Sequence, residues 1–312
     1  QIAALNEKIK TRNDQALLGQ VNELQALVSE LEAESNAQKI VKVTIEQRTD
    51  GLKLRTPTVS AQNLSFNNQG EDVTAGDINF GKYYALVIGI EKYNQINSLD
   101  TPVNDINAIA DILSDRYGFQ VQKVVNADDV SIMEAINNIN EQLTENDNLL
   151  IFYAGHGARI QTGEIESGYW LPTNAEPAPR DTYWVSNEFV TRHLVRFKAK
   201  RVLVVADSCY AGLLSSAPGF LMMGQNGVLT EDYIKYKADK RSRLLLSSGG
   251  DKPVLDGAGG SHSIFTQAFL QALENNSEIM SGPQLFMQVR KQVAASAKEV
   301  DFDQNPQYKT IK

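Results

Sequence analysis

The chain has 312 residues, of which 42% are hydrophobic and 22% are charged. These proportions are typical of a globular protein, and the length suffices for one large domain or two ordinary ones. The net charge of -8 argues against a general nucleic-acid-binding face, so we expect no nucleic-acid partner. No apolar run approaches the roughly 18 residues that a membrane span needs, so none is expected in this chain.

The counts of cysteine and histidine limit the chemistry further. The one cysteine, Cys209, excludes an intramolecular disulfide and a multi-cysteine zinc site. An all-histidine site would need all three histidines, so we predict no metal site.

The chain opens at Gln1, so an upstream signal or membrane anchor is not excluded. Otherwise a soluble, cytoplasmic protein is expected.

Residues 1–39 are expected to form a helix. Its apolar residues alternate steps of four and three, the a/d pattern of a coiled coil: Leu17, Val21, Leu24, Val28 and Leu31. Two clean heptads are fewer than a coiled coil normally shows. Two interpretations therefore stay open. The segment either mediates homo-oligomerisation or binding of a partner protein, or it forms an amphipathic helix that packs on a domain.

Residues 40–82 are expected to form a β-hairpin followed by a linker. Apolar and polar residues alternate from Val41 to Ile45, and the alternation resumes after a turn at Asp50-Gly51. Asn, Gly and Ser are then frequent. Nothing in this segment points to chemistry.

Residues 83–312 alternate apolar strands with amphipathic helices. This pattern predicts right-handed crossovers and an α/β domain with a mostly parallel sheet flanked by helices. The sequence has no glycine-rich phosphate loop, so no nucleotide cofactor is expected. The expected strands are 84–90, 121–125, 148–153, 201–207, 244–247 and 308–311. The expected helices are 102–117, 130–143, 186–195, 262–274 and 283–298, and a polar loop is expected after strand 148–153.

Two of these strands end in reactive side chains. Strand 201–207 runs into Ser208-Cys209, and strand 148–153 runs through Ala-Gly into His156-Gly157. A lone cysteine is commonly a small buried hydrophobe, but the polar and small neighbours of Cys209 favour an exposed turn. Parallel strands present their carboxyl ends at one edge of the sheet. If the two strands are neighbours, thiol and imidazole meet there.

Such a meeting would create a nucleophile. A free thiol titrates near pH ~8.5, so a base such as His156 is needed to generate the thiolate of Cys209 at neutral pH. Gly157 has no side chain, so its N–H can approach a carbonyl oxygen closely and form an oxyanion hole with the Cys209 N–H.

The two motifs are similar to those of a known family. Residues 153–157 (Tyr-Ala-Gly-His-Gly) and 207–212 (Asp-Ser-Cys-Tyr-Ala-Gly) resemble the histidine and cysteine motifs of the caspase/metacaspase superfamily. The resemblance is closer to metacaspases and bacterial caspase-like proteins (orthocaspases) than to animal caspases, which carry Gln-Ala-Cys. It spans about 83–312 and includes residues 102–105 and 261–266.

The resemblance implies a caspase-like fold and a cysteine endopeptidase that cleaves after Arg or Lys. It assigns Cys209 as nucleophile and His156 as base and later proton donor. Asp207 and Asp105 match the aspartates that line the specificity pocket, and Asp251 is expected to shape the pocket from a neighbouring loop. Paired carboxylates suit a guanidinium. The alternative for Asp105 and Asp207 is an ordinary cap or turn aspartate.

The acidic residues depart from the pattern of calcium-dependent metacaspases, which bind the ion through acidic runs. The loop after His156 has only scattered acids, Glu164, Glu166 and Asp181, and Asn174 stands where an acid is often found. We therefore expect no cofactor and no calcium activation.

The other two histidines lack the glycine context of His156. His193 is expected on a solvated helix face beside two arginines. His262 is expected as a structural residue in the cap region of the helix that it begins.

The insertion 213–243 is basic in its second half. If the enzyme cuts after basic residues, the loop 233–243 is a candidate for self-cleavage. The alternatives are a flexible charged loop or a lid over the site. The candidate positions are Lys235, Lys237, Lys240, Arg241 and Arg243.

Two other functions compete with the peptidase. One is a signalling scaffold, in which the caspase-like fold binds a partner and residues 1–39 drive assembly. The other is a small-molecule thiol hydrolase, for which no compact pocket signature is present. An intact Cys209 and His156 favour the peptidase.

Overall fold

The computed structural model describes residues 64–65, 74–75, 78–215, 231–249, 260–277, 279–302 and 304–311. The chain divides into two units, Gln1–Thr56 and Pro57–Lys312, and every described residue belongs to the second. The helix expected over 1–39 and the hairpin expected at 41–54 lie outside the described residues. So does Asp251.

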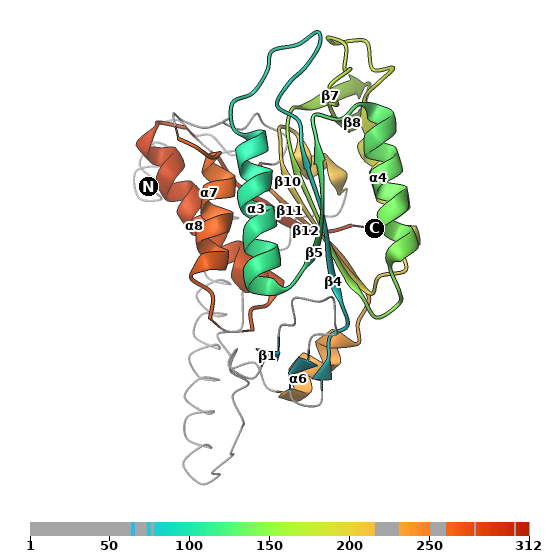
Figure 1. Cartoon of the computed structure of the whole chain (residues 1–312). Helices are drawn as coiled ribbons and strands as arrows, with labels where there is room; N and C mark the ends of the chain where they lie inside the picture. The colour runs from blue at the N-terminus through green and yellow to red at the C-terminus, as the bar shows by residue number, and fades with distance from the viewer. Residues whose placement is uncertain are drawn as a thin grey trace, which may run out of the picture. The chain divides into compact units, whose positions relative to one another are not determined.

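A six-stranded sheet forms the centre of the second unit (Figure 1), in the order β12-β11-β10-β6-β4-β5. Every neighbouring pair is parallel except β11 and β12, which run antiparallel. The α/β architecture and the mostly parallel sheet are therefore confirmed. The bounds are β4 (Tyr83–Gly89), β5 (Gln120–Val125), β6 (Asn148–Ala154), β10 (Arg201–Asp207), β11 (Ser242–Ser247) and β12 (Gln307–Thr310).

Helices cover both faces of this sheet. One face packs against α3 (Pro102–Tyr117), α7 (Ile264–Glu274) and α8 (Gly282–Glu299), and the other packs against α4 (Asp129–Gln142) and α5 (Asn187–Arg196). Figure 1 shows α3, α7 and α8 together on one side and α4 on the other. A strand covered on both faces is apolar along nearly its whole length, which explains the long hydrophobic runs in the sequence.

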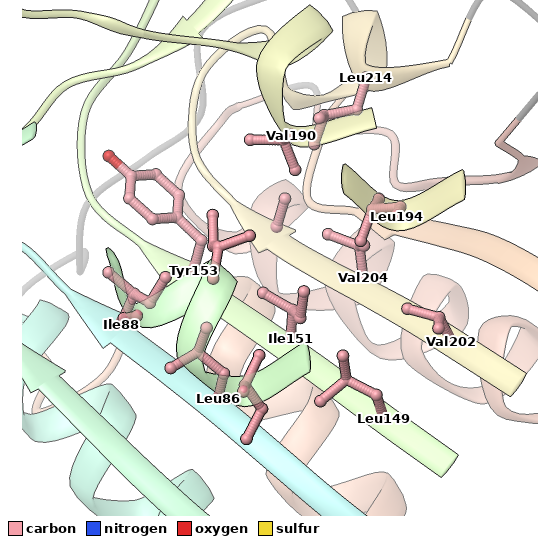
Figure 2. Packing of buried hydrophobic residues seen from close by; sticks show 14 of the residues in the cluster. Leu86, Ile88, Leu149, Ile151, Tyr153, Val190, Leu194, Val202, Val204 and Leu214 are labelled. Atoms are coloured by element: carbon pink, nitrogen blue, oxygen red, sulfur yellow. The ribbon is translucent and has the colours of Figure 1, made fainter. Parts of the chain in front are cut away.

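The central strand β6 shows this two-sided burial. All seven of its residues are buried. Leu149, Ile151 and Tyr153 belong to one core cluster, and Leu150 and Phe152 belong to the other. Figure 2 shows the first cluster, in which side chains of β6, β4 and β10 lie beneath those of α5. This double packing fixes the ends of β6 and β10, from which the candidate site extends.

Local sequence signals explain the helix boundaries. Pro102 stands in the first turn of α3, where its missing N–H costs nothing, and Gly118 ends the helix with a φ of 66°. Asp128 caps α4 by accepting a hydrogen bond from the Ser131 N–H, and Ser263 caps α7 through the Thr266 N–H. Helix α7 therefore begins after His262.

Two small antiparallel sheets lie where the sequence indicated loops. The polar stretch after His156 forms the hairpin of β7 (Gly157–Thr162) and β8 (Ile165–Trp170), which β9 (Val185–Ser186) extends. Within the segment expected to be a linker, β1 (Leu64–Ser65), β2 (Thr74–Ala75) and β3 (Ile78–Asn79) form a second sheet.

The basic segment is also more regular than a flexible loop. Residues Glu231–Ala238 form α6, and Arg243 lies inside β11. The expectation that Arg243 belongs to a loop was wrong. Its side chain is buried and its guanidinium donates hydrogen bonds to the carbonyls of Leu194, Phe197, Ala199, Lys200 and Ser242. It thus supplies hydrogen-bond donors to carbonyl groups at and just after the carboxyl end of α5.

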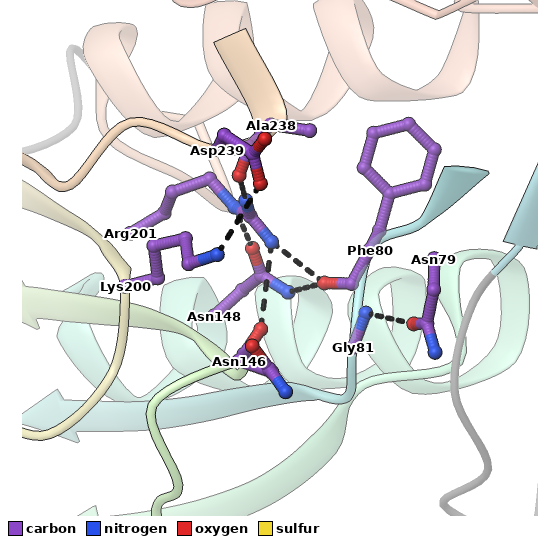
Figure 3. A network of polar contacts seen from close by, with 9 residues as sticks. All are labelled: Asn79, Phe80, Gly81, Asn146, Asn148, Lys200, Arg201, Ala238 and Asp239. Atoms are coloured by element: carbon purple, nitrogen blue, oxygen red, sulfur yellow. Dashed lines mark hydrogen bonds and ion pairs between the residues drawn. The ribbon is translucent and has the colours of Figure 1, made fainter. Parts of the chain in front are cut away.

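A second arginine fixes α6 at the amino-terminal edge of the sheet (Figure 3). Arg201 begins β10 and donates to the carbonyls of Phe80 at 2.7 Å and of Ala238. Asn148, which begins β6, donates to the same Phe80 carbonyl at 2.7 Å. Lys200 and Asp239 add an ion pair at 3.7 Å. These contacts place the end of α6 beside the first residues of the central strands.

Substituting Arg243→Met is expected to lower the free energy of unfolding by about 3 kcal/mol, because five carbonyl groups lose a buried donor. Burial and the nearby Arg241 lower the pKa of Arg243 to about 10, so the arginine remains charged at neutral pH. Urea unfolding measures the change. Lys198→Met, at an exposed position close by, is the control and should change stability by less than about 0.5 kcal/mol. Equal stability of the two variants would contradict this role.

Candidate active site

The two motif-bearing strands are neighbours. Strands β6 and β10 pair in parallel, and Ala154 lies opposite Asp207 in the register. His156 and Cys209 each follow two residues after that pair, so the two loops leave the sheet side by side. The condition on which the sequence argument depended is met.

The two loops are in direct contact at Gly157. A Cβ atom added to Gly157 would lie 2.0 Å from the Cys209 carbonyl oxygen and 3.3 Å from the Ser208 Oγ. No side chain fits at that distance, so the position requires glycine for close approach rather than for backbone freedom. The Gly155 N–H also donates to the Asp207 carbonyl at 3.4 Å.

A backbone carbonyl orients the imidazole of His156. Its Nε2 lies 2.9 Å from the carbonyl oxygen of Asn97. Because a carbonyl only accepts hydrogen bonds, Nε2 carries the hydrogen and donates it. In the neutral ring Nδ1 then holds the lone pair and can act as the base.

Tyr93 supports the same histidine from a second side. Its hydroxyl accepts a hydrogen bond from the His156 N–H at 2.8 Å and donates one to the Ile90 carbonyl at 3.1 Å. Its ring lies 4.9 Å from the imidazole, centroid to centroid. No sequence pattern pointed to Asn97 or Tyr93, since both belong to the irregular segment after β4 and Asn97 acts through its backbone.

Tyr153 holds the backbone of His156. Its hydroxyl donates to the His156 carbonyl at 2.7 Å, and the Leu171 N–H donates to the same carbonyl at 3.0 Å. Its ring stacks on Trp170 at 4.4 Å with an angle of 3°. Burial raises the pKa of Tyr153 well above 10, so the phenol stays a neutral donor. The peptide group of His156 is thus held from several directions.

The chain turns sharply after Cys209, which is half-buried. Tyr210 has a φ of 58°, in the left-handed region that side chains other than glycine seldom adopt, and a short 3-10 helix (Ala211–Leu214) follows. Such strain is on the order of 1–3 kcal/mol and is concentrated at functional sites. The Arg159 guanidinium lies 5.1 Å above the Tyr210 ring and pairs with Glu166 at 3.1 Å. The β7–β8 hairpin therefore packs against the turn that follows Cys209.

Asp207 and Asp105 meet the same turn before α7. The Asp207 carboxylate is buried and accepts hydrogen bonds from the hydroxyls of Ser263 and of Thr266, the latter at 2.8 Å. Asp105, on α3, is fully buried, and its Oδ1 lies 2.8 Å from Nδ1 of His262. Adjacent residues of one turn therefore hold the two predicted pocket aspartates.

The contact between His262 and Asp105 is a site feature that sequence reasoning missed. The residues are 157 positions apart, and no local pattern links them. Burial lowers the pKa of His262, while Glu274 acts in the opposite direction. His193 contacts its own helix, with Nδ1 2.8 Å from the Phe189 carbonyl and its ring 4.1 Å from that of Phe189.

The polar residues named for the loop after His156 contact protein groups. Glu166 pairs with Arg159. The side-chain amide of Asn174 donates to the Asp129 carboxylate at 2.8 Å, and the Asp129 N–H donates to the side-chain oxygen of Asn174 at 3.2 Å. Asp181 accepts from the Tyr169 hydroxyl at 3.5 Å. Across the described ranges, no three His, Cys, Asp or Glu side chains gather closely enough to hold a metal ion.

None of the helices in the described part of the chain is both long and apolar enough to span a membrane.

The sheet order and the contact of the loops that carry His156 and Cys209 define an α/β protein with a histidine and a cysteine just beyond two neighbouring parallel strands. Residues 82–311 match the model of the family described as Caspase domain. The chain belongs to this caspase family, whose members are cysteine-type peptidases.

Curated relatives with similar sequences are metacaspases. Metacaspase-1B of Aspergillus fumigatus is 26% identical over 189 residues, which cover 54% of this chain and 45% of that protein. Metacaspase-7 of Arabidopsis thaliana is 28% identical over 146 residues, covering 41% and 34%. Metacaspase-1 of Lodderomyces elongisporus is 23% identical over 243 residues, covering 70% and 52%. The matches therefore span about half of these relatives or less.

A solved structure shares the fold. The crystal structure of protein GSU0716 from Geobacter sulfurreducens superposes with a TM-score of 0.52 and 20% identity. The match covers 73% of this chain and 93% of that one. At this identity the likeness concerns the fold alone.

Proposed function

We propose that this protein is a cysteine endopeptidase that cleaves peptide bonds after Arg or Lys through a dyad of Cys209 and His156. The observation that carries the proposal is the contact between the two strand-end loops, where Gly157 lies against the Cys209 carbonyl. Membership of the caspase family supports the same chemistry.

The residues have distinct roles in this reaction. His156 Nδ1 takes the proton of the Cys209 thiol, and the thiolate attacks the carbonyl carbon of the scissile bond. The N–H groups of Gly157 and Cys209 stabilise the resulting oxyanion. His156 then gives its proton to the departing amine, which leaves an acyl-enzyme. Water, deprotonated by His156, attacks the acyl group and releases the carboxylic acid and the thiol.

Two buried carboxylates support a preference for basic side chains. Asp207 lies two residues before the nucleophile, and Asp105 reaches the same turn from α3. A guanidinium or ammonium group bound there would neutralise charges that are costly to bury alone. Asp251, outside the described residues, remains a predicted further contributor.

Self-cleavage in the basic segment is part of the proposal, with Lys240 as the favoured position. Lys235 and Lys237 lie within α6, and Arg243 lies within β11. Lys240 is exposed in the connection between these elements. The adjacent Arg241 donates to the carbonyls of Val195 and Phe197, both at 2.9 Å, so cutting after it would disturb those contacts.

Two further features of the proposal concern cofactors and partners. We propose that catalysis needs no calcium, because the acids that would bind it contact protein groups instead. We also propose that residues 1–39 mediate self-association or bind a partner protein, on the basis of their heptad pattern.

A panel of fluorogenic peptides ending in Arg, Lys or Asp tests the function, with each substrate assayed with calcium and with a chelator. We expect the Arg and Lys peptides to be cleaved and the Asp peptide to be spared, with calcium having little effect. Cys209→Ala is the control, and its activity should fall by at least ~1000-fold. Cleavage by Cys209→Ala would remove Cys209 as nucleophile, and a complete lack of turnover would favour the scaffold.

A further inference from the structure

The proposed pocket contains an ionisable group that the reaction does not use. His262 lies at the turn before α7 and contacts Asp105, one of the two carboxylates assigned to the substrate. We propose that His262 is a specificity-determining residue of the basic pocket: it shares the Asp105 carboxylate with the substrate's basic side chain, and only neutral His262 leaves the full negative charge of Asp105 to that side chain. This inference rests on the proposed function.

The geometry places the histidine as a partner of the buried charge. Asp105 is fully buried, and its Oδ1 lies 2.8 Å from Nδ1 of His262. A carboxylate only accepts hydrogen bonds, so Nδ1 carries a hydrogen in both protonation states of the ring. The side chain of His262 retains 21% exposure. It can therefore exchange a proton with solvent while its contact with Asp105 persists.

The two pocket carboxylates have different partners. Asp207 is held by the hydroxyls of Ser263 and Thr266, which are neutral at any pH of interest and leave its charge in place. Asp105 is held by an imidazole, which becomes a cation when it gains a proton. The pocket thus combines one carboxylate of constant net charge with one whose charge His262 can neutralise.

The charges around His262 come from three described elements. Asp105 faces it from α3, Asp207 at the end of β10 is bound to the adjacent Ser263, and Glu274 acts on it from α7. Burial outweighs the opposing effect of Glu274 and holds the pKa of His262 below its usual value. The imidazole is then neutral near pH 7. As the pH falls through that pKa, the ring becomes charged and competes with an incoming guanidinium for Asp105.

Binding of benzamidine, a guanidinium-like probe, to the Cys209→Ala variant tests the competition. This variant lacks the thiol, so its titration cannot contribute. Calorimetry over about pH 5 to 8 should show the affinity falling as the pH falls, approaching roughly tenfold per unit below the pKa of His262. Adding His262→Asn should flatten this dependence to within about twofold, because an asparagine amide can still donate to Asp105 but does not titrate.

A second measurement needs no change at His262. Because linkage is reciprocal, saturating benzamidine should lower the pKa of His262 in the Cys209→Ala protein, as followed by NMR of the imidazole protons. An unchanged pKa would overturn the proposal.

The outcomes separate the two proposals. If the Cys209→Ala protein and the double variant with His262→Asn bind benzamidine with the same pH dependence, the proposed role of His262 is wrong while the basic pocket stands. If benzamidine binds neither protein at any pH, the basic pocket itself is wrong, and the role of His262 is overturned with it.

Discussion

Gly157→Ala should reduce kcat/KM by at least about 100-fold. The added Cβ would lie 2.0 Å from the Cys209 carbonyl oxygen and 3.0 Å from its carbonyl carbon, both of them backbone atoms that cannot rotate away. The loops that carry His156 and Cys209 must therefore move apart. A shift on the order of 1 Å between reacting groups is sufficient for a loss of this size. Steady-state kinetics with an arginyl peptide measure the effect.

A second glycine in the same hairpin provides the matched control. Gly163 has a φ of 63°, and nothing lies within 4 Å of a Cβ added there. Gly163→Ala should therefore cost about 1 kcal/mol of stability through its backbone and leave kcat/KM almost unchanged. If the two variants lost activity equally, close approach at Gly157 would not be what the reaction requires.

Asp207→Asn should lower kcat/KM for arginyl peptides by about 30-fold or more. Removing one partner of a buried, hydrogen-bonded charge pair costs at least about 2 kcal/mol, and often more. Asparagine keeps the shape of the side chain and an oxygen that can accept from Ser263 and Thr266, which now hold Asp207 Oδ2. The fold should therefore remain stable while the substrate loses its ionic partner.

Asp207→Ala separates this role from a structural one. Alanine also removes the acceptor of two hydroxyls at the start of α7, so it should lower the thermal midpoint as well as the activity. A purely structural Asp207 would predict that Asp207→Asn retains full activity toward arginyl peptides. Comparing kcat/KM with thermal unfolding for both variants decides between the roles.

The central sheet was predictable because its signals are local. The bounds of α3 and β10 agree with the sequence prediction, since Pro102, Gly118 and the apolar run before Asp207 mark them directly. The β7–β8 hairpin was missed, because a strand pair with few buried residues has little of the apolar content by which buried strands are recognised.

The motif residues of the site were predictable, but their supporting contacts were not. His156 and Cys209 stand at the ends of recognisable strands, and the pairing of β6 with β10 brings their loops together. Asn97 acts through a backbone carbonyl, which every residue type provides. Arg243 also binds carbonyls, so its sequence neighbourhood resembled a charged loop. The contact of His262 with Asp105 depends on how α3 and α7 pack.

The network at the start of β10 has a consequence for self-cleavage. Lys240 lies two residues before Ser242, which pairs with Arg201 at the beginning of β10, whereas Cys209 follows the opposite end of that strand. Seven strand residues span roughly 20 Å. A folded molecule therefore cannot bring its own Lys240 to its own Cys209. Processing at Lys240 would have to occur in trans, between two molecules, and its initial rate would rise with the square of the protein concentration.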